Sequence, residues 1–214
     1  MTEPASRGWK QRLATPFGLL AIFIAVLWGI EAYDTYLNNQ SLHTHGIKPR
    51  DMTGLDGILW TPFLHADWAH LTNNTLGLAT LGWLTSERGG KYLATVTAWS
   101  VLAGGAAVWL TGETGSVHIG SSGLVFGFLG AIVGAAIFER NAASIASALL
   151  VVMFYSSMFV GLVPQAGISW EGHLFGLLAG MIAAKRLAPE KTEPVKKPYE
   201  PEDWELDEPW ITGT

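Results

Sequence analysis

The side chains best suited to chemistry stand at the start of two apolar, glycine-rich stretches. Ser122 lies in a Gly-Ser-Ser-Gly turn, residues 120–123, and the chain then runs apolar to residue 134 with further glycines. His173 heads a second stretch of the same build, Gly-His-Leu-Phe-Gly-Leu-Leu-Ala-Gly. A hydroxyl at a helix N-terminus lies where backbone N–H groups lack helical partners and negative charge is favoured. The two side chains therefore fit a nucleophile and a general base, with neutral imidazole taking the hydroxyl proton.

Neighbouring residues indicate how this pair would be supported. A serine in an apolar helix, taken alone, more often bonds back to a carbonyl of its own helix. A histidine inside an apolar span is costly to bury and is usually functional. Neither predicted helix contains Asp or Glu, so no carboxylate third member is evident. Phe126, one turn beyond Ser122, is placed to stack on the imidazole, and Ser169 is placed to hydrogen-bond it.

A second polar group consists of His65, His70 and Asn74. The spacing of four puts His70 and Asn74 on one helical face, with His65 just outside it. These side chains are either zinc ligands or hydrogen-bond donors aimed at a common point. The zinc-peptidase pattern His-Glu-x-x-His is absent, and an amide is a poor zinc ligand. Asn and His donors near a helix N-terminus suit an oxyanion hole, so we expect neither a metal nor another cofactor.

Composition favours a membrane protein. Of the 214 residues, 49% are hydrophobic and only 14% are charged, whereas soluble domains have about 25% charged residues. The chain has no cysteine, which excludes disulfides and a thiol nucleophile. It has no basic stripe that would suggest nucleic-acid binding.

Apolar runs predict an all-α protein with six transmembrane helices and a long first loop at residues 34–69. The expected spans are residues 13–30, 71–84, 92–111, 122–138, 142–163 and 172–184. The second is weakly apolar, so its polar groups should face protein or water. A transporter or channel that used this polar cluster would be expected to show internal repeats, and we find none.

Charge asymmetry predicts the orientation. With a cytoplasmic N-terminus, eleven Lys and Arg residues fall on the cytoplasmic side and two on the other, in agreement with the positive-inside rule. Residues 1–12 then form a cytoplasmic N-terminal segment and 13–187 the helical domain. The acidic, proline-rich residues 188–214 are expected to be a disordered cytoplasmic tail. Both termini are thus predicted to be cytoplasmic in a multi-pass protein, which we expect to lie in a bacterial plasma membrane.

Three motifs carry a family resemblance. His-Ala-Asp-Trp-Ala-His-Leu-Thr-Asn-Asn at 65–74, Gly-Ser-Ser-Gly at 120–123 and the stretch that begins with Gly172-His173 resemble those of the rhomboid family of intramembrane serine proteases. They occur in the family's order, on what would be its second, fourth and sixth helices, and the similarity covers residues 13–187. Gly-x-Ser-Gly alone is weak, but the combination is highly specific.

The resemblance implies roles for individual residues. Ser122 would be the nucleophile and His173 the base, while His70, Asn74 and the Ser122 N–H would bind the oxyanion. His65, Phe126, Gly120 and Gly123 would support the site; Phe126 stands where the family often has Tyr. Thr61 follows Trp60 where many members have Arg, which is a departure in the first loop.

The resemblance also implies the partners. Substrates would be single-span transmembrane proteins reached from the lipid bilayer. The alternative function is a catalytically silent rhomboid-like chaperone or scaffold, but such proteins usually lack the serine or the histidine, and both are present here.

Overall fold

The structure is a computed structural model that describes residues 15–165 and 167–189. Every regular element within these ranges is a helix, and one isolated antiparallel bridge joins Ile47 to His118. The predicted segment 1–12 lies outside the described residues, as does the predicted tail from residue 190 onward. Over the described ranges, the all-α prediction is confirmed.

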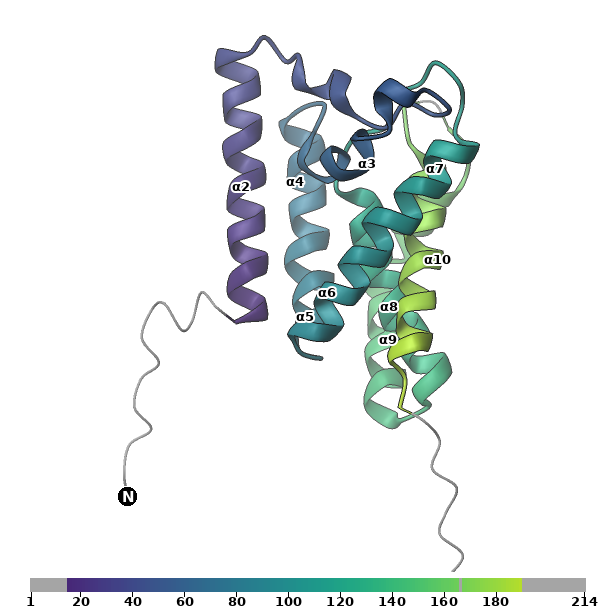
Figure 1. The fold of residues 1–214 in the computed structure, drawn as a ribbon. Helices are drawn as coiled ribbons and strands as arrows, with labels where there is room; N and C mark the ends of the chain where they lie inside the picture. The colour runs from purple at the N-terminus through teal and green to yellow at the C-terminus, as the bar shows by residue number, and fades with distance from the viewer. Residues whose placement is uncertain (1–14, 166, 190–214) are drawn as a thin grey trace, which may run out of the picture.

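Long helices stand beside one another, and the first loop lies across one end of them (Figure 1). In chain order these helical segments are α2 (Pro16–Leu37), α4 (Trp68–Gly77) continued by η4 (Leu78–Gly82) and α5 (Trp83–Ser86), α6 (Gly90–Ala98) continued by η5 (Trp99–Gly104) and α7 (Gly105–Thr111), α8 (Ser122–Glu139), α9 (Ala142–Phe154) followed by η6 (Ser156–Leu162), and α10 (Trp170–Leu187). The loop between α2 and α4 contains the short turns η1 (Leu42–His45), η2 (Met52–Gly54), α3 (Gly57–Trp60) and η3 (Thr61–Phe63).

Three helical segments within the described ranges are long and apolar enough to cross a membrane. They are Pro16–Leu37, Gly90–Thr111 and Ser122–Glu139. The bent pair Ala142–Phe154 and Ser156–Leu162 makes a fourth if it is counted as one span. The other two predicted spans do not meet these criteria, because α4 is polar and interrupted and α10 carries Glu171, Lys185 and Arg186. The number of six spans therefore stays a prediction.

The first helix is longer than its charges suggest. α2 continues past Glu31 to Leu37, and Glu31 and Asp34 are only 4% and 5% exposed. Oδ1 of Asp34 accepts hydrogen bonds from the Asn38 side chain at 2.9 Å and the Leu42 N–H at 3.1 Å. Because these donors satisfy the carboxylate, it can be buried where the chain leaves the helix. The predicted end of the helix at residue 30 is therefore wrong.

The predicted span 142–163 is not one straight helix. The chain bends by 73° between α9 and η6, where Tyr155 leaves helical geometry with φ −110° and ψ 19°. The Tyr155 hydroxyl is hydrogen-bonded to Thr80 of η4. The bend turns η6 toward α10, where Gly161 meets His173.

The core is centred on α8, which is buried from Leu124 to Ala135 at almost every position. Glycines allow α10 to approach it closely. A side chain at Gly176 would overlap the Gly123 carbonyl, and one at Gly180 would overlap the Gly127 carbonyl. Small residues at such spacing are typical of close helix packing in membranes. This contact sets how closely α8 and α10 pack along their length.

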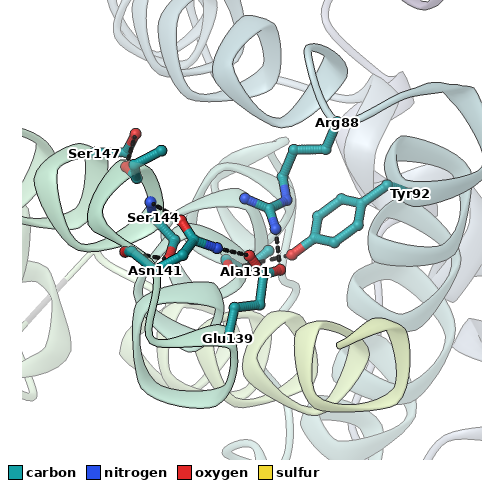
Figure 2. A network of polar contacts seen from close by, with 8 residues as sticks. Arg88, Tyr92, Ala131, Glu139, Asn141, Ser144 and Ser147 are labelled. Carbon is teal, nitrogen blue, oxygen red and sulfur yellow. Dashed lines mark hydrogen bonds and ion pairs between the residues drawn. The ribbon is translucent and has the colours of Figure 1, made fainter. Parts of the chain in front are cut away.

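The far end of α8 is held by a polar clasp (Figure 2). Arg88 forms an ion pair with Glu139 and lies over the Tyr92 ring at 4.7 Å. The Asn141 side chain donates to Glu139 at 3.1 Å, and its Oδ1 caps α9 by accepting from the Ser144 N–H at 2.9 Å. The clasp joins the ends of α5, α6, α8 and α9, at the opposite end of α8 from Ser122.

Candidate active site

Ser122 and His173 lie together at the N-terminal ends of α8 and α10. The Ser122 Oγ is 2.9 Å from the His173 Nε2, and both residues are half-buried. α8 begins at Ser122, and no side chain caps its N-terminus. The Ser122 hydroxyl therefore lies beside backbone N–H groups that have no partner inside the helix.

The other nitrogen of His173 decides where its proton is. Nδ1 lies 2.8 Å from the carbonyl oxygen of Gly161 in η6. A carbonyl oxygen only accepts hydrogen bonds, so Nδ1 carries the proton and donates it. Nε2 of the neutral ring is then unprotonated and accepts from the Ser122 hydroxyl. This is the arrangement that a general base for serine requires.

The ring of His173 is also held from the side. The Phe126 ring stacks on it, with centroids 4.3 Å apart and planes at 12°. The stacking contact expected from the sequence is thus present. Together with the Gly161 carbonyl, it leaves the imidazole little freedom to turn away from Ser122.

His70 and Asn74 reach the site from α4. This helix begins at Trp68, three residues earlier than predicted, because Asp67 caps it by accepting from the His70 N–H at 2.7 Å. Both side chains converge on Gly120, where an added Cβ would lie 2.6 Å from His70 Nε2 and 3.3 Å from Asn74 Nδ2. Gly120 also has φ +107°, a conformation that favours glycine. Glycine here gives both donors access to the turn before Ser122.

The Asn74 side chain has an unused donor. Asn74 is only 6% exposed, and its Nδ2 is buried without a hydrogen-bond partner. Buried polar atoms are nearly always satisfied, so an orphaned donor needs an explanation. A ligand oxygen beside Ser122 would supply the missing acceptor.

His65 lies behind these donors. It is 3% exposed, its ring packs edge-on against that of His70 at 5.2 Å, and its Nε2 is 3.4 Å from the Ser121 Oγ. Burial lowers the pKa of His65 from 6.5 to about 4. The ring is therefore neutral at physiological pH and serves as packing between α4 and the turn at Ser121.

A cavity of about 40 Å³ adjoins Ser122. Its wall combines the hydroxyl-bearing residues Thr61, Ser100 and Ser169 with apolar side chains such as Ile58 and Val108. A space of this size with several hydroxyl groups in its wall can hold water. Within the described residues, no group of three or more His, Cys, Asp or Glu is placed to hold a metal ion.

Two expectations about the neighbours of His173 are wrong. Ser169 does not bond His173 through its side chain; it lies 2.6 Å from His118 Nδ1 and caps α10. α10 starts at Trp170, so Glu171 lies in its first turn, although the chain was expected to have no acid in that helix. The cause of both is that the helix begins two residues earlier than predicted, because the Ser169 hydroxyl accepts from the Gly172 N–H at 3.3 Å.

Sequence reasoning missed two residues at this site. Gly161 supplies the carbonyl for His173, and His118 links the loop before Ser122 to the cap of α10. No sequence pattern marks Gly161, because it contributes only a backbone carbonyl to the site. His118 could have been considered from the sequence, because it is a histidine only four residues before Ser122.

Comparison with known proteins places the chain among membrane proteins of one family. A family model described as the Rhomboid domain matches residues 55–190. The chain is 38% identical over 179 residues to an uncharacterised protein of Mycobacterium tuberculosis, covering 79% of this chain and 74% of that protein. It is 38% identical over 186 residues to an uncharacterised protein of Mycobacterium leprae, covering 82% and 73%. It is 30% identical over 139 residues to the rhomboid-like protease 5 of Toxoplasma gondii, covering 63% of this chain but 16% of that protein.

Proposed function

The chain belongs to the rhomboid family, and on that premise we propose that it is an intramembrane serine endopeptidase with Ser122 as nucleophile and His173 as general base. The observation that carries the proposal is the pair of hydrogen bonds on His173. Nδ1 donates to the Gly161 carbonyl, and Nε2 is left to accept from Ser122. The base is thus held in the tautomer that the reaction needs.

In the first step, the Ser122 Oγ attacks the carbonyl carbon of the scissile peptide bond while its proton moves to His173 Nε2. The carbonyl oxygen becomes an oxyanion. We assign its donors to Asn74 Nδ2, His70 Nε2 and the Ser122 N–H, because the first two converge on Gly120 and Asn74 Nδ2 has no other partner.

The C–N bond then breaks, and the imidazolium gives its proton to the leaving amine, which leaves an acyl ester on Ser122. A water molecule then attacks this ester while His173 Nε2 takes one of its protons. That proton passes to the Ser122 Oγ as the C–O bond to the serine breaks and the acid product departs. The cavity beside Ser122 can hold water for this step.

We further propose that the substrates are single-span transmembrane proteins that enter from the lipid bilayer. The protein would lie in a bacterial plasma membrane with both termini cytoplasmic, so that Ser122 opens toward the non-cytoplasmic side. The positive-inside distribution of Lys and Arg supports this orientation.

The test uses a serine-reactive fluorophosphonate on the detergent-solubilised full chain, with the modified residue located by mass spectrometry. Wild type should be labelled at Ser122, and Ser122→Ala should not be labelled. His173→Ala keeps the hydroxyl but should react about 10²–10⁴-fold more slowly, because the base is gone. Ser147→Ala removes an exposed hydroxyl on α9 and should label as wild type does. Normal labelling of His173→Ala would refute the dyad and favour a silent scaffold.

A further inference from the structure

His118 is a buried imidazole that the proposed reaction does not use. It lies in the loop between α7 and α8, four residues before Ser122, and is 8% exposed. Its Nδ1 is 2.6 Å from the Ser169 Oγ, and its Nε2 is 2.9 Å from the Ser116 Oγ. Both ring nitrogens are therefore bonded to hydroxyls, one in the same loop and one at the N-cap of α10.

The other hydrogen bonds of these two hydroxyls show which nitrogen of His118 carries the ring proton. Ser116 Oγ donates to the Glu113 carbonyl at 2.6 Å, so it must accept from His118, and Nε2 carries the ring proton. Nδ1 then carries no proton and accepts a hydrogen bond from the Ser169 hydroxyl. Ser169 Oγ in turn accepts from the Gly172 N–H at 3.3 Å. The result is one unbroken chain of donors from the first turn of α10 to the Glu113 carbonyl.

The backbone of His118 is anchored as firmly as its ring. It exchanges two hydrogen bonds with Ile47, and its carbonyl also accepts from the Thr61 hydroxyl at 2.9 Å. The first loop, the Ser122 loop and the cap of α10 therefore meet at one residue. Ser169, the last of these, has its carbonyl bonded to the His173 N–H at 3.1 Å.

We propose that His118 is a positioning residue that ties the loop leading to Ser122 to the N-cap of the helix carrying His173. It acts through Ser169 and touches no reacting atom. This inference rests on the proposed function, because the distance it would hold is that between the Ser122 Oγ and the His173 Nε2. Without the tie, the two helices keep their glycine contact, but their N-terminal ends are free to separate.

The kinetic test measures the rate of fluorophosphonate labelling at Ser122 per folded protein. His118→Phe keeps a ring and the α10 cap but loses the bond to Ser169, and it should label about tenfold more slowly, the size expected of one hydrogen bond. Ser169→Ala should show a similar loss, and Ser169→Thr, which retains the hydroxyl, should recover most of the rate. Thr15→Ala removes the side-chain cap of α2 and should leave the rate unchanged, which controls for cap loss elsewhere.

The double variant His118→Phe/Ser169→Ala separates a tie from two independent effects. If one hydrogen bond is responsible, the double variant should label no more than about twofold more slowly than either single variant. The proposal would be overturned if the rate losses of the two single variants multiplied in the double variant. It would also be overturned if His118→Phe labelled at the wild-type rate, or if the variants lowered the melting temperature without slowing labelling.

A second measurement does not depend on activity. In Ser122→Ala protein carrying ¹⁵N-labelled histidine, NMR should show His118 protonated on Nε2 alone, and adding Ser169→Ala should shift the Nδ1 signal. The signal is assigned by its absence in His118→Phe. A proton on Nδ1, or a signal indifferent to Ser169→Ala, would refute the tie. Failure of wild type to label at Ser122 would instead refute the proposed function.

Discussion

The Gly161 carbonyl oxygen lies 2.8 Å from the Nδ1 of His173, in the place where a Ser-His-Asp site has its carboxylate. A neutral carbonyl fixes the tautomer and the direction of the ring, but it brings no negative charge to stabilise the imidazolium. The position of η6 is therefore part of the catalytic arrangement that we propose, even though none of its side chains reacts.

Gly161→Ala tests this relationship. The added Cβ would lie 2.9 Å from His173 Nδ1 and 3.4 Å from the Phe126 Cζ, so the imidazole or η6 must move. A shift of about 1 Å in a reacting group can cost about 10²-fold in rate, and we expect a loss of that order in Ser122 labelling. Gly29→Ala is the control, because nothing lies within 4 Å of its Cβ. A wild-type rate in Gly161→Ala would contradict the role of η6.

Asn74→Ala removes the unpartnered buried donor. We expect kcat for cleavage of a single-span substrate to fall by about 10²–10³-fold, the usual effect of losing one oxyanion donor. The melting temperature should hardly change, because Nδ2 makes no hydrogen bond in the resting protein. Asn73→Ala is the matched control, because Asn73 is adjacent to Asn74 but is exposed and does not share the helical face of His70 and Asn74. Inhibition by a strong chelator that zinc reverses would show instead that this group binds metal.

The sequence could predict those parts of the site whose residue types are themselves unusual. Ser122, His173, His70 and Asn74 are polar groups in apolar or helical surroundings, and their spacing indicated the chemistry. Gly161 could not be found in this way, because its contribution is a carbonyl that a 73° bend brings to His173. No local pattern specifies such a contact across 12 residues.

In the fold, too, the features marked by residue type were predictable and those made by tertiary contacts were not. Apolar runs predict where most helices lie, but they place the end of α2 too early, because charged residues usually mark the membrane boundary. Glu31 and Asp34 instead lie within α2 with buried side chains. The burial of Asp34 depends on hydrogen-bond donors from the turn that follows the helix. Such compensation is a property of tertiary contacts and is not visible in hydropathy.

The clasp around Arg88 and Glu139 should stabilise the bundle without affecting the chemistry. Arg88→Ala leaves the Glu139 side chain, only 8% exposed, without its cation, and we expect a loss of about 1–3 kcal/mol in the free energy of unfolding. Adding Glu139→Gln should recover part of it by removing the unpaired charge. Thermal unfolding in detergent measures both, with Lys91→Ala as an exposed-charge control. Slower Ser122 labelling in folded Arg88→Ala would show that the clasp also acts on the site.

His65 should make the protein sensitive to acid. Burial lowers its pKa to about 4, below the 6.5 of an unfolded chain. Between these values the unfolded state binds more protons, so stability falls as pH drops from about 6.5 to about 4 and then levels off. The difference amounts to about 3 kcal/mol for this one group.

The measurement is the melting temperature of detergent-solubilised protein from pH 7.5 to pH 4. His65→Asn cannot titrate, so its melting temperature should fall less steeply over this range than that of wild type. Burial also lowers the pKa of His118. Its contribution to the fall of melting temperature with pH has the same sign and is present in both proteins, so it cancels when they are compared. Equal slopes would mean that His65 is not protonated on unfolding.

Orientation decides from which side a substrate's cleavage site would be reached. The first loop and the start of α6 lie at opposite ends of the bundle (Figure 1). His45 belongs to the first loop and Lys91 to the start of α6, and both side chains are exposed. Because the chain has no cysteine, His45→Cys and Lys91→Cys each create a single thiol. With eleven Lys and Arg residues predicted inside and two outside, an impermeant thiol reagent should label intact bacterial cells that express the His45→Cys variant. The Lys91→Cys variant should react only after the cells are lysed. The reverse pattern would place Ser122 toward the cytoplasm, so that substrates would be cut near their cytoplasmic ends.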